Sequence, residues 1–199
     1  MKTQTSEDSP IRLSEVARSS DTGGWLAITL APGKKTVGSW VHWDRDLDAD
    51  LDRLVELGTT VLAPLLEDHE LRGLHIPGLV EAARARGLEV VRFPIRDVSV
   101  PGSMDATIGF VAGLAARVRR GEHVVVNCNG GLGRSGLIAA CARLALDLDP
   151  DAATAIAAVR ERRRDAIETP AQERFVEQFL DAWKAPGPAP PGGGGEPRP

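Results

Sequence analysis

The chain has 199 residues and a formal net charge of −4, from 24 Lys and Arg against 28 Asp and Glu. That length is typical of one domain with a sizeable core, and the acidic balance lacks the concentrated basic charge that a nucleic-acid partner needs. No apolar run reaches the roughly 18 residues of a transmembrane helix, and residues 1–21 lack the apolar core of a signal peptide. We therefore expect a cytoplasmic protein without a membrane contact.

Two tails frame the predicted domain. Residues 1–20 are rich in Ser, Thr and charged side chains and are expected to form a flexible tail. Residues 185–199 consist almost entirely of Pro, Gly and Ala, a composition that cannot bury apolar surface and predicts disorder. The domain itself is expected to span residues 21–184.

Strands and helices alternate through most of that domain. Short apolar, β-branched runs predict strands, whereas apolar residues at helical spacing, often ended by glycine, predict helices. In chain order the predicted elements are strand 25–30, helix 48–57, strand 59–65, helix 77–86, strand 88–93, helix 104–120, strand 123–126, and helices 135–146, 151–163 and 171–183. This order predicts an α/β fold with a mainly parallel central sheet flanked by helices.

A glycine-rich loop follows the last predicted strand, at the carboxyl edge where such folds bind ligands. It begins at Cys128 and continues as Asn129, Gly130, Gly131, Leu132, Gly133, Arg134 and Ser135. Glycines allow successive backbone N–H groups to converge on one point. The N-terminus of the following helix adds free N–H groups and a positive dipole end. The loop therefore predicts a phosphate-binding site.

The side chains of the loop predict the chemistry. The same field favours the thiolate of Cys128, which is the nucleophilic form of a cysteine. Arg134 closes the ring, and its planar guanidinium can grip two phosphate oxygens at once. Ser135 places a hydroxyl near the sulfur, where it can help the thiolate leave in a second step.

The loop has two other interpretations. Gly131 to Gly136 also fits the G-x-G-x-x-G fingerprint of dinucleotide sites, but no strand follows residue 147 to complete that unit. Such a site also gives no role to Cys128 or Arg134. A tight glycine turn with a buried structural cysteine is the simplest alternative, and a Cys-x5-Arg-Ser segment between strand and helix argues against it.

Phosphoryl transfer also needs a proton donor for the leaving oxygen, best supplied from a separate loop. Asp97 follows the predicted strand 88–93 and precedes the turn residues Pro101 and Gly102. It is the predicted general acid, the alternative being a solvated turn residue or a helix cap. Asp105 fits the role of cap for helix 104–120 better.

These residues resemble the cysteine-dependent tyrosine and dual-specificity protein phosphatases, and among them the kinase-associated phosphatases and their bacterial relatives. The signature His-Cys-x5-Arg-Ser/Thr stands here as Asn127-Cys128 to Arg134-Ser135. The likeness covers most of residues 25–183. It includes Leu30-Ala-Pro-Gly-Lys-Lys35, Pro94-Ile-Arg-Asp97 and the segment from Ala166 to Phe175.

The resemblance implies a two-step reaction without metal or organic cofactor. Cys128 attacks phosphorus while Asp97 protonates the leaving oxygen, and a water then hydrolyses the cysteinyl-phosphate with Asp97 as base. The substrate would be a phosphorylated protein or peptide, and the enzyme a monomer. The family's water-positioning segment, often Gln-Thr-x-x-Gln, reads Glu168-Thr-Pro-Ala-Gln172 here, so Gln172 is a candidate for that role or a helix N-terminal polar residue.

Asn127 stands where the family has histidine. We expect it to hydrogen-bond nearby backbone groups and to tune the thiolate more weakly than histidine would. Lys34 and Lys35 are expected beside the pocket mouth, where they either meet a second anionic group or form a solvated turn. Trp40 and Trp43 are candidates for stacking on a substrate ring or for ordinary packing.

Three other functions remain open at this point. A phosphatase-like binding module would hold phosphoproteins without turnover. A phosphatase for small or lipid phosphates would usually carry basic residues inside the loop, and residues 129–133 contain none. Sulfur transfer or arsenate reduction would need other thiol chemistry, with Cys141 as the resolving cysteine. Neither the two cysteines nor the four histidines show metal-ligand spacing.

Overall fold

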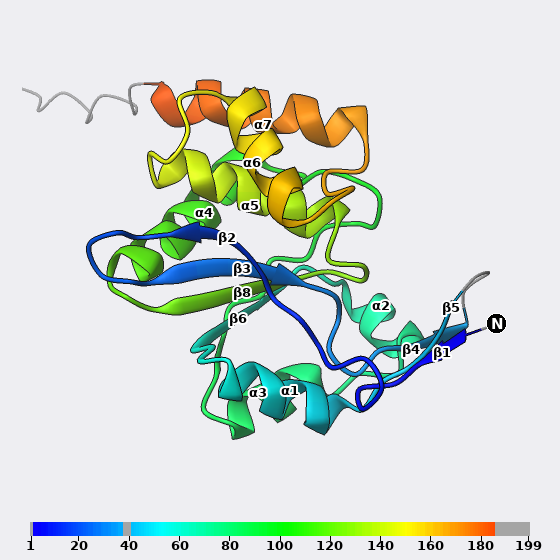
Figure 1. Cartoon of the computed structure of the whole chain (residues 1–199). Coiled ribbons are helices and arrows are strands. Elements are labelled where there is room, and N and C mark those ends of the chain that lie inside the picture. The colour runs from blue at the N-terminus through cyan, green and yellow to red at the C-terminus, as the bar shows by residue number, and fades with distance from the viewer. Residues whose placement is uncertain (1, 38–40, 186–199) are drawn as a thin grey trace, which may run out of the picture.

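The computed structural model describes residues 2–37 and 41–185. Its centre is a five-stranded sheet of order β2-β3-β8-β6-β7, in which only β2 runs antiparallel to its neighbour (Figure 1). The strands are β2 (Ser14–Arg18), β3 (Trp25–Thr29), β6 (Val61–Pro64), β7 (Glu89–Val90) and β8 (His123–Asn127). The predicted α/β class with a mainly parallel sheet is confirmed.

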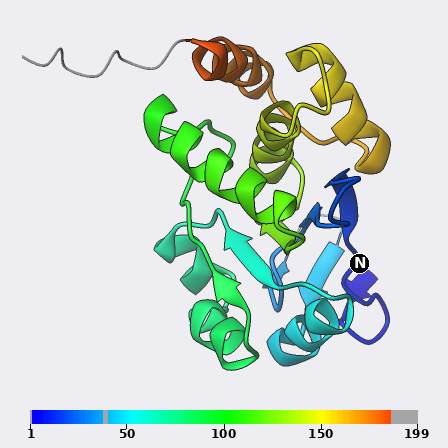
Figure 2. The ribbon, with the colours of Figure 1, turned by 90° about the vertical axis from the view of Figure 1, so that its left-hand side faces the viewer.

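Helices cover both faces of this sheet (Figure 2). One face carries α4, α5, α6 and α7, and the other carries α1 and α3 (Figure 1). Their bounds are α1 (Leu47–Glu56), α3 (Leu79–Ala85), α4 (Met104–Arg119), α5 (Gly133–Ala145), α6 (Ala152–Arg162) and α7 (Pro170–Lys184). Each of these helices was predicted from the sequence to within a few residues.

The central strand β8 shows why the sheet is buried on both sides. Val124 and Val126 belong to the core beneath α4 and α5, whereas Val125 belongs to the core beneath α1 and α3. Successive side chains of a strand point to opposite faces, so a strand buried on both faces reads as a continuous apolar run. β8 ends at Asn127, and Cys128 is the first residue to leave the sheet at its carboxyl edge.

A second, smaller sheet lies beside the first and was not predicted (Figure 1). It consists of β1 (Lys2–Gln4), β5 (Val41–Asp44) and β4 (Lys35–Val37) in that order. The Lys35 N–H donates to the carbonyl of Leu74 at 2.9 Å and so ties β4 to the end of α2 (Asp68–Gly73). Strands of three or four residues with mixed polarity carry no clear period in the sequence.

The prediction of a flexible tail over residues 1–20 is wrong for the described residues. β2 forms the outer strand of the main sheet, with Val16 and Ala17 buried, and Ile11 is buried in the core on the opposite face. These apolar side chains are scattered among charged ones, so the composition of residues 1–20 did not predict a buried strand. The proposed C-terminal tail lies outside the described residues from 186 onward, and Trp40 also lies outside them.

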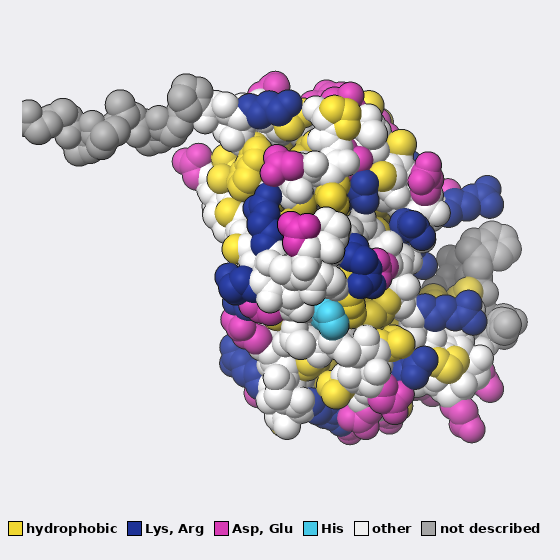
Figure 3. Space-filling model, turned by 60° about the vertical axis from the view of Figure 1, so that its left-hand side comes forward, with side chains coloured by type: hydrophobic (Ala, Val, Ile, Leu, Met, Phe, Trp, Pro, Cys, Tyr) yellow, Lys and Arg dark blue, Asp and Glu magenta, His cyan; other side chains and the backbone are white. Residues whose placement is uncertain are grey.

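Basic and acidic side chains alternate over the face that Figure 3 shows, without a large area of one sign. Such mixing gives no concentrated positive field for a nucleic acid on that face. Among the described residues, no helix combines the length and the apolar character that crossing a membrane requires.

Candidate active site

The phosphate-binding loop begins where the central strand ends. β8 pairs in parallel with β3 on one side and with β6 on the other, so Cys128 emerges between two neighbouring strands. The Leu65 N–H donates to the carbonyl of Asn127 at 2.8 Å, and the Ala31 N–H donates to the carbonyl of Asn129 at 3.2 Å. These bonds fix the backbone on both sides of Cys128.

Two glycines let the loop turn sharply against its surroundings. Gly131 has φ +68°, and a side chain there would collide with the backbone of Thr29. A side chain at Gly133 would collide with the Glu168 carboxylate, which lies over this end of the loop together with the Gln172 amide. Gly131 therefore requires glycine for steric and conformational reasons, whereas a side chain at Gly133 would push the exposed Glu168 carboxylate aside.

The helix that follows the loop supplies free donors. α5 begins at Gly133, and its first intrahelical bond runs from the Gly136 N–H to the carbonyl of Leu132 at 2.9 Å. The N–H groups of the three residues 133–135 therefore have no partner within the helix. Together with the helix dipole they favour an oxyanion at this point.

The nucleophile and its neighbour are in contact. The Sγ of Cys128 lies 3.0 Å from the Oγ of Ser135, and both side chains are buried. A hydroxyl at that distance can donate to a thiolate and stabilise it as a leaving group. The predicted pairing of Cys128 with Ser135 is thus consistent with the geometry.

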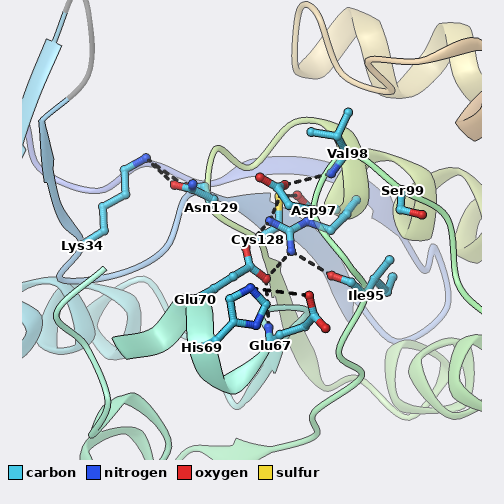
Figure 4. Close-up of polar contacts among 12 residues, drawn as sticks. Lys34, Glu67, His69, Glu70, Ile95, Asp97, Val98, Ser99, Cys128 and Asn129 are labelled. Atoms are coloured by element: carbon cyan, nitrogen blue, oxygen red, sulfur yellow. Dashed lines mark hydrogen bonds and ion pairs between the residues drawn. The ribbon is translucent and has the colours of Figure 1, made fainter. Parts of the chain in front are cut away.

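Arg134 is held by groups from two separate segments, α2 and the loop after β7. Its guanidinium donates to both carboxylate oxygens of Glu70, at 2.7 and 2.8 Å, and to the carbonyl of Ile95 at 2.8 Å (Figure 4). Burial alone lowers the pKa of an arginine, but the bond to Glu70 and the negative charges of Cys128, Glu70 and Asp97 outweigh it, so the pKa of Arg134 is raised. Arg134 therefore keeps its charge in the buried site.

Glu70 is the functional residue that the sequence did not indicate. It lies on α2, whose N-terminus is closed by Glu67 and Glu70 in a reciprocal capping arrangement. The Glu67-x-x-Glu70 spacing is a weak signal for a helix start. Nothing in the sequence indicates that Glu70 meets Arg134, which lies 64 residues further along the chain.

Asp97 lies at the mouth of the site and also contacts Arg134. One carboxylate oxygen is 2.7 Å from the second terminal nitrogen of Arg134, and the Asp97 side chain is 56% exposed (Figure 4). The same oxygen accepts a bond from the Val98 N–H at 3.0 Å. Val98 has φ +54°, a strained conformation for a β-branched residue that often marks a functional loop.

Both terminal nitrogens of Arg134 lie against acceptor atoms. One terminal nitrogen donates hydrogen bonds to Glu70 and to the carbonyl of Ile95. The other donates to Glu70 and forms an ion pair with Asp97. Glu70 and Ile95 are fixed parts of the fold, whereas Asp97 is exposed. Asp97 is therefore the partner of Arg134 that an incoming phosphate could displace most easily.

Gln172 is engaged in structural bonds. Its Oε1 accepts from the N–H of Glu168 at 2.9 Å and of Thr169 at 3.3 Å, and its Nε2 donates to the carbonyl of Ser99 at 3.2 Å. Gln172 therefore caps α7 and ties it to the segment after Asp97. Its role in positioning water stays a prediction.

Asn127 does not behave as expected. Its side chain is fully buried, and neither amide atom has a hydrogen-bond partner among the described residues. The expectation that it would bond nearby backbone groups is wrong, because the backbone groups of β3 and β6 on both sides already pair with the backbone of β8. Asn127 supplies no positive charge beneath the loop.

Of the other candidate residues, some lie beside the loop and others lie away from it. Lys34 reaches the loop and bonds Asn129, whereas Lys35 is half-exposed and pairs with Asp44 at 2.8 Å. Trp43 stacks against Lys34, whose Nζ lies 4.3 Å from the ring centroid. Asp105 lies in the first turn of α4, but the N-cap of that helix is Ser103.

Cys141 is fully buried in α5, and burial raises the pKa of its thiol well above the ordinary value. A thiol that does not ionise is a poor resolving nucleophile, which argues against arsenate reduction. No cluster of His, Cys, Asp or Glu that could hold a metal ion occurs within residues 2–37 and 41–185.

Comparisons with known proteins agree with this geometry. The chain is 27% identical over 181 residues to cyclin-dependent kinase inhibitor 3 of Rattus norvegicus and 26% identical to that of Homo sapiens, in each case over 90% of this chain and 83% of the relative. It is similar to the crystal structure of kinase-associated phosphatase with serine in place of the catalytic cysteine. That match has a TM-score of 0.78 and 25% identity, over 89% of this chain and 98% of the other.

The active form of Tk-PTP is a further structural relative, with a TM-score of 0.67 and 25% identity over 85% of this chain and 96% of that one. The family described as "Polymorphic toxin system, DSP-PTPase phosphatase" matches residues 37–145, more than half of the chain. That match contains Glu70, Asp97 and the whole loop from Cys128 to Ser135. The chain therefore belongs to this family of dual-specificity-type, cysteine-dependent phosphatases.

Proposed function

We propose that the protein hydrolyses phosphate monoesters on tyrosine, serine or threonine side chains of proteins through a cysteinyl-phosphate on Cys128. The observation that carries this proposal is the arrangement around Arg134. A buried guanidinium is fixed by Glu70 and Ile95, faces the buried thiol of Cys128, and is capped by the exposed Asp97. Two rigid partners orient the guanidinium, and one displaceable partner makes room for the phosphate.

In the first step the Cys128 thiolate attacks phosphorus, so that an S–P bond forms and the ester P–O bond breaks. The leaving oxygen takes its proton from the protonated carboxyl of Asp97. The phosphate oxygens are held by Arg134 and by the N–H groups at the start of α5. Because the loop is built before substrate arrives, its donors need no reorganisation during the reaction.

In the second step water attacks the phosphorus of the cysteinyl-phosphate and gives its proton to the Asp97 carboxylate. The S–P bond breaks, and the thiolate leaves towards the Ser135 hydroxyl, 3.0 Å away. Inorganic phosphate is released and the thiolate is regenerated. We propose no direct role for Gln172 in this step beyond holding α7 and the Ser99 backbone in place, since its amide is already bonded.

The composition of the loop supports a monoester on a protein as substrate. Residues 129–133 contain no Lys, Arg or His, so the loop itself offers no cation for the additional phosphates of a lipid headgroup. Cyclin-dependent kinase inhibitor 3 and kinase-associated phosphatase bear names that refer to protein kinases. We propose a phosphoprotein substrate on these two grounds, a monomeric enzyme, and a cytoplasmic setting that keeps Cys128 reduced.

The test is hydrolysis of an aryl phosphate and of a panel of phosphotyrosine, phosphothreonine, phosphoserine and phosphoinositide substrates. We expect turnover of the aryl phosphate and of phosphopeptides, inhibition by vanadate in competition with substrate, and loss of turnover in Cys128→Ser. Cys141→Ala is the matched control and should retain turnover, because that thiol is buried away from the site.

Unchanged turnover in Cys128→Ser would refute the mechanism. Binding of phosphopeptides without any turnover by the wild-type protein would instead identify a binding module. Preference for the phosphoinositide would refute the proposed substrate class but leave the chemistry in place.

A further inference from the structure

Lys34 is a buried lysine that the mechanism above does not use. Its side chain lies beside the loop, and the residue is only 4% exposed. The ammonium donates to the carbonyl oxygen of Asn129 at 3.0 Å and to the Asn129 side-chain oxygen at 3.3 Å (Figure 4). Asn129 is the residue directly after the nucleophile, so Lys34 fixes the position of the first loop residue after Cys128.

The backbone around Lys34 has little freedom to place the side chain elsewhere. Gly33 has φ +72°, and a side chain there would collide with Leu47. The Gly33 N–H donates to Asp50 at 2.8 Å, and the carbonyl of Lys34 accepts from the Arg45 N–H at 3.2 Å. The turn that carries Lys34 is therefore fixed by the pair Arg45–Asp50 beneath it.

The charge of Lys34 has no carboxylate partner among the described residues, in contrast to Lys35, which pairs with Asp44. A buried ammonium without a counter-charge is costly. The Trp43 ring, 4.3 Å from Nζ, offsets part of that cost through a cation–π contact. The anionic group that faces Lys34 is the Cys128 thiolate. Burial lowers the pKa of Lys34, and the charge of this thiolate raises it.

We propose that Lys34 is a positioning residue of this active site, an inference that rests on the proposed phosphatase function. Its ammonium holds Asn129 in place and supplies a positive charge that favours the Cys128 thiolate. In this way it provides the electrostatic support that the uncharged Asn127, buried beneath the loop, does not provide. Lys34 acts through the loop and the sulfur and does not touch the phosphate.

This role depends on pH. Burial, then the positive charges of Arg45 and Arg163, lower the pKa of Lys34 to about 8, with Cys128 acting in the opposite direction. These three are the charged groups that face the ammonium, from the segments after β5, after α6 and after β8. Lys34 is thus charged at neutral pH and loses its charge as the pH rises through about 8.

The test compares Lys34→Met, which keeps the length of the side chain without the charge, with Lys34→Arg and with the matched control Lys35→Met. Two quantities are measured against pH: the rate of Cys128 alkylation by iodoacetamide, and kcat/KM for an aryl phosphate. Each quantity rises with pH at the acidic side of its profile, and we call this rise the acidic limb. In Lys34→Met the acidic limbs of both profiles should move to higher pH by about one unit, because a nearby opposite charge shifts an ionisation by that order. Below the limb kcat/KM should then fall about tenfold.

Lys34→Arg should keep the acidic limbs near their wild-type positions, and Lys35→Met should leave them unchanged. A uniform loss at every pH, or no movement of the alkylation limb in Lys34→Met, would overturn the proposal. Alkylation of Cys128 does not require turnover. If the wild-type protein is inactive but its alkylation profile still depends on Lys34, the proposed function is refuted and this inference stands.

A second measurement avoids any change at position 34. The Lys34 ammonium is titrated by NMR in the wild-type protein and in Cys128→Ser. Removal of the thiolate should lower the titration midpoint of Lys34, since Cys128 raises its pKa. An identical midpoint in the two proteins would mean that the sulfur and the ammonium do not interact, and would overturn the proposal.

Discussion

The protein contains two buried arginines that look alike in isolation and differ in their surroundings. Arg45 directly follows β5 of the small sheet and donates two bonds of 2.7 Å to Asp50, with both side chains only 1% exposed. Arg134, also 1% exposed, donates two comparable bonds to Glu70. Both guanidinium groups additionally donate to a backbone carbonyl, of Ser9 in one case and of Ile95 in the other.

The difference lies in a second acidic partner, which Arg134 has and Arg45 lacks. The contacts of Arg45 are all with fixed parts of the fold, and Asp50 in turn accepts the Gly33 N–H that shapes the Lys34 turn. Arg134 has the exposed Asp97 as an additional partner and lies beside a thiol. A buried ion pair closed on all sides is structural, whereas one with a displaceable partner beside a nucleophile can exchange that partner for substrate.

The largest effect is expected from Arg134→Lys. A lysine lacks the fork that binds Glu70 and phosphate together, so kcat/KM should fall on the order of 10³-fold, the upper range for loss of one preorganised donor. Steady-state kinetics with an aryl phosphate measures this, and urea unfolding serves as the stability control. A loss below about threefold would contradict the functional reading of Arg134.

Arg45→Met should lower the stability of the fold, whereas Arg134→Lys should mainly lower activity. It leaves the Asp50 carboxylate buried without its partner, which should destabilise the fold by about 3–5 kcal/mol. The free energy of unfolding in urea measures the effect. The double variant Arg45→Met/Asp50→Leu should recover most of that loss, because replacing a whole buried pair by apolar residues is often neutral. Unchanged stability in the single variant would break the comparison.

Asp97→Asn separates the two roles given to that carboxyl. Loss of the proton donor should lower kcat about 10²-fold for substrates with poor leaving groups and much less for activated aryl esters. Loss of the negative charge next to Arg134 should at the same time tighten vanadate binding a few-fold. Asp105→Asn is the matched control and should change neither quantity; equal loss for good and poor leaving groups would argue against Asp97 as acid.

Lys34→Met should raise stability while it lowers activity. The pKa of Lys34 falls from an ordinary 10.5 to about 8 on folding, so the unfolded state binds more protons between these values. The lysine therefore costs stability below pH 8, and its contribution improves as the pH rises towards 10.5. At pH 7 the variant should be about 1–2 kcal/mol more stable, after allowance for the lost bonds to Asn129. Thermal or urea unfolding across pH checks both the gain and its disappearance at high pH.

The parts of this site that lie together in the sequence could be predicted, and those that meet only in space could not. The loop from Cys128 to Ser135 carries its glycines, nucleophile and arginine within one segment, so local chemistry identifies it. Asp97 was found because phosphoryl transfer needs a proton donor from another loop. Glu70 has no local signal, and Lys34 was placed beside the pocket only through the family resemblance. Their bonds to Arg134 and Asn129 join residues 64 and 95 positions apart in the sequence.

The fold shows the same division. Helices such as α4 have a long apolar period and defined ends, and the buried strands around β8 read as apolar runs. β1, β2, β4 and β5 are short and polar on at least one side, and their stability comes from pairing partners elsewhere in the chain. Composition alone therefore assigned the N-terminal strands to a tail.

The most direct test of the central claim is to trap the covalent intermediate. The wild-type protein is mixed with an aryl phosphate, quenched in acid within the first turnovers, digested and analysed by mass spectrometry. We predict a phosphate group on the peptide that contains Cys128, more of it in Asp97→Asn because that variant also slows hydrolysis, and none in Cys128→Ser. Turnover with a phosphate on another residue, or with none trapped on Cys128 in either protein, would contradict the assignment of Cys128 as the nucleophile.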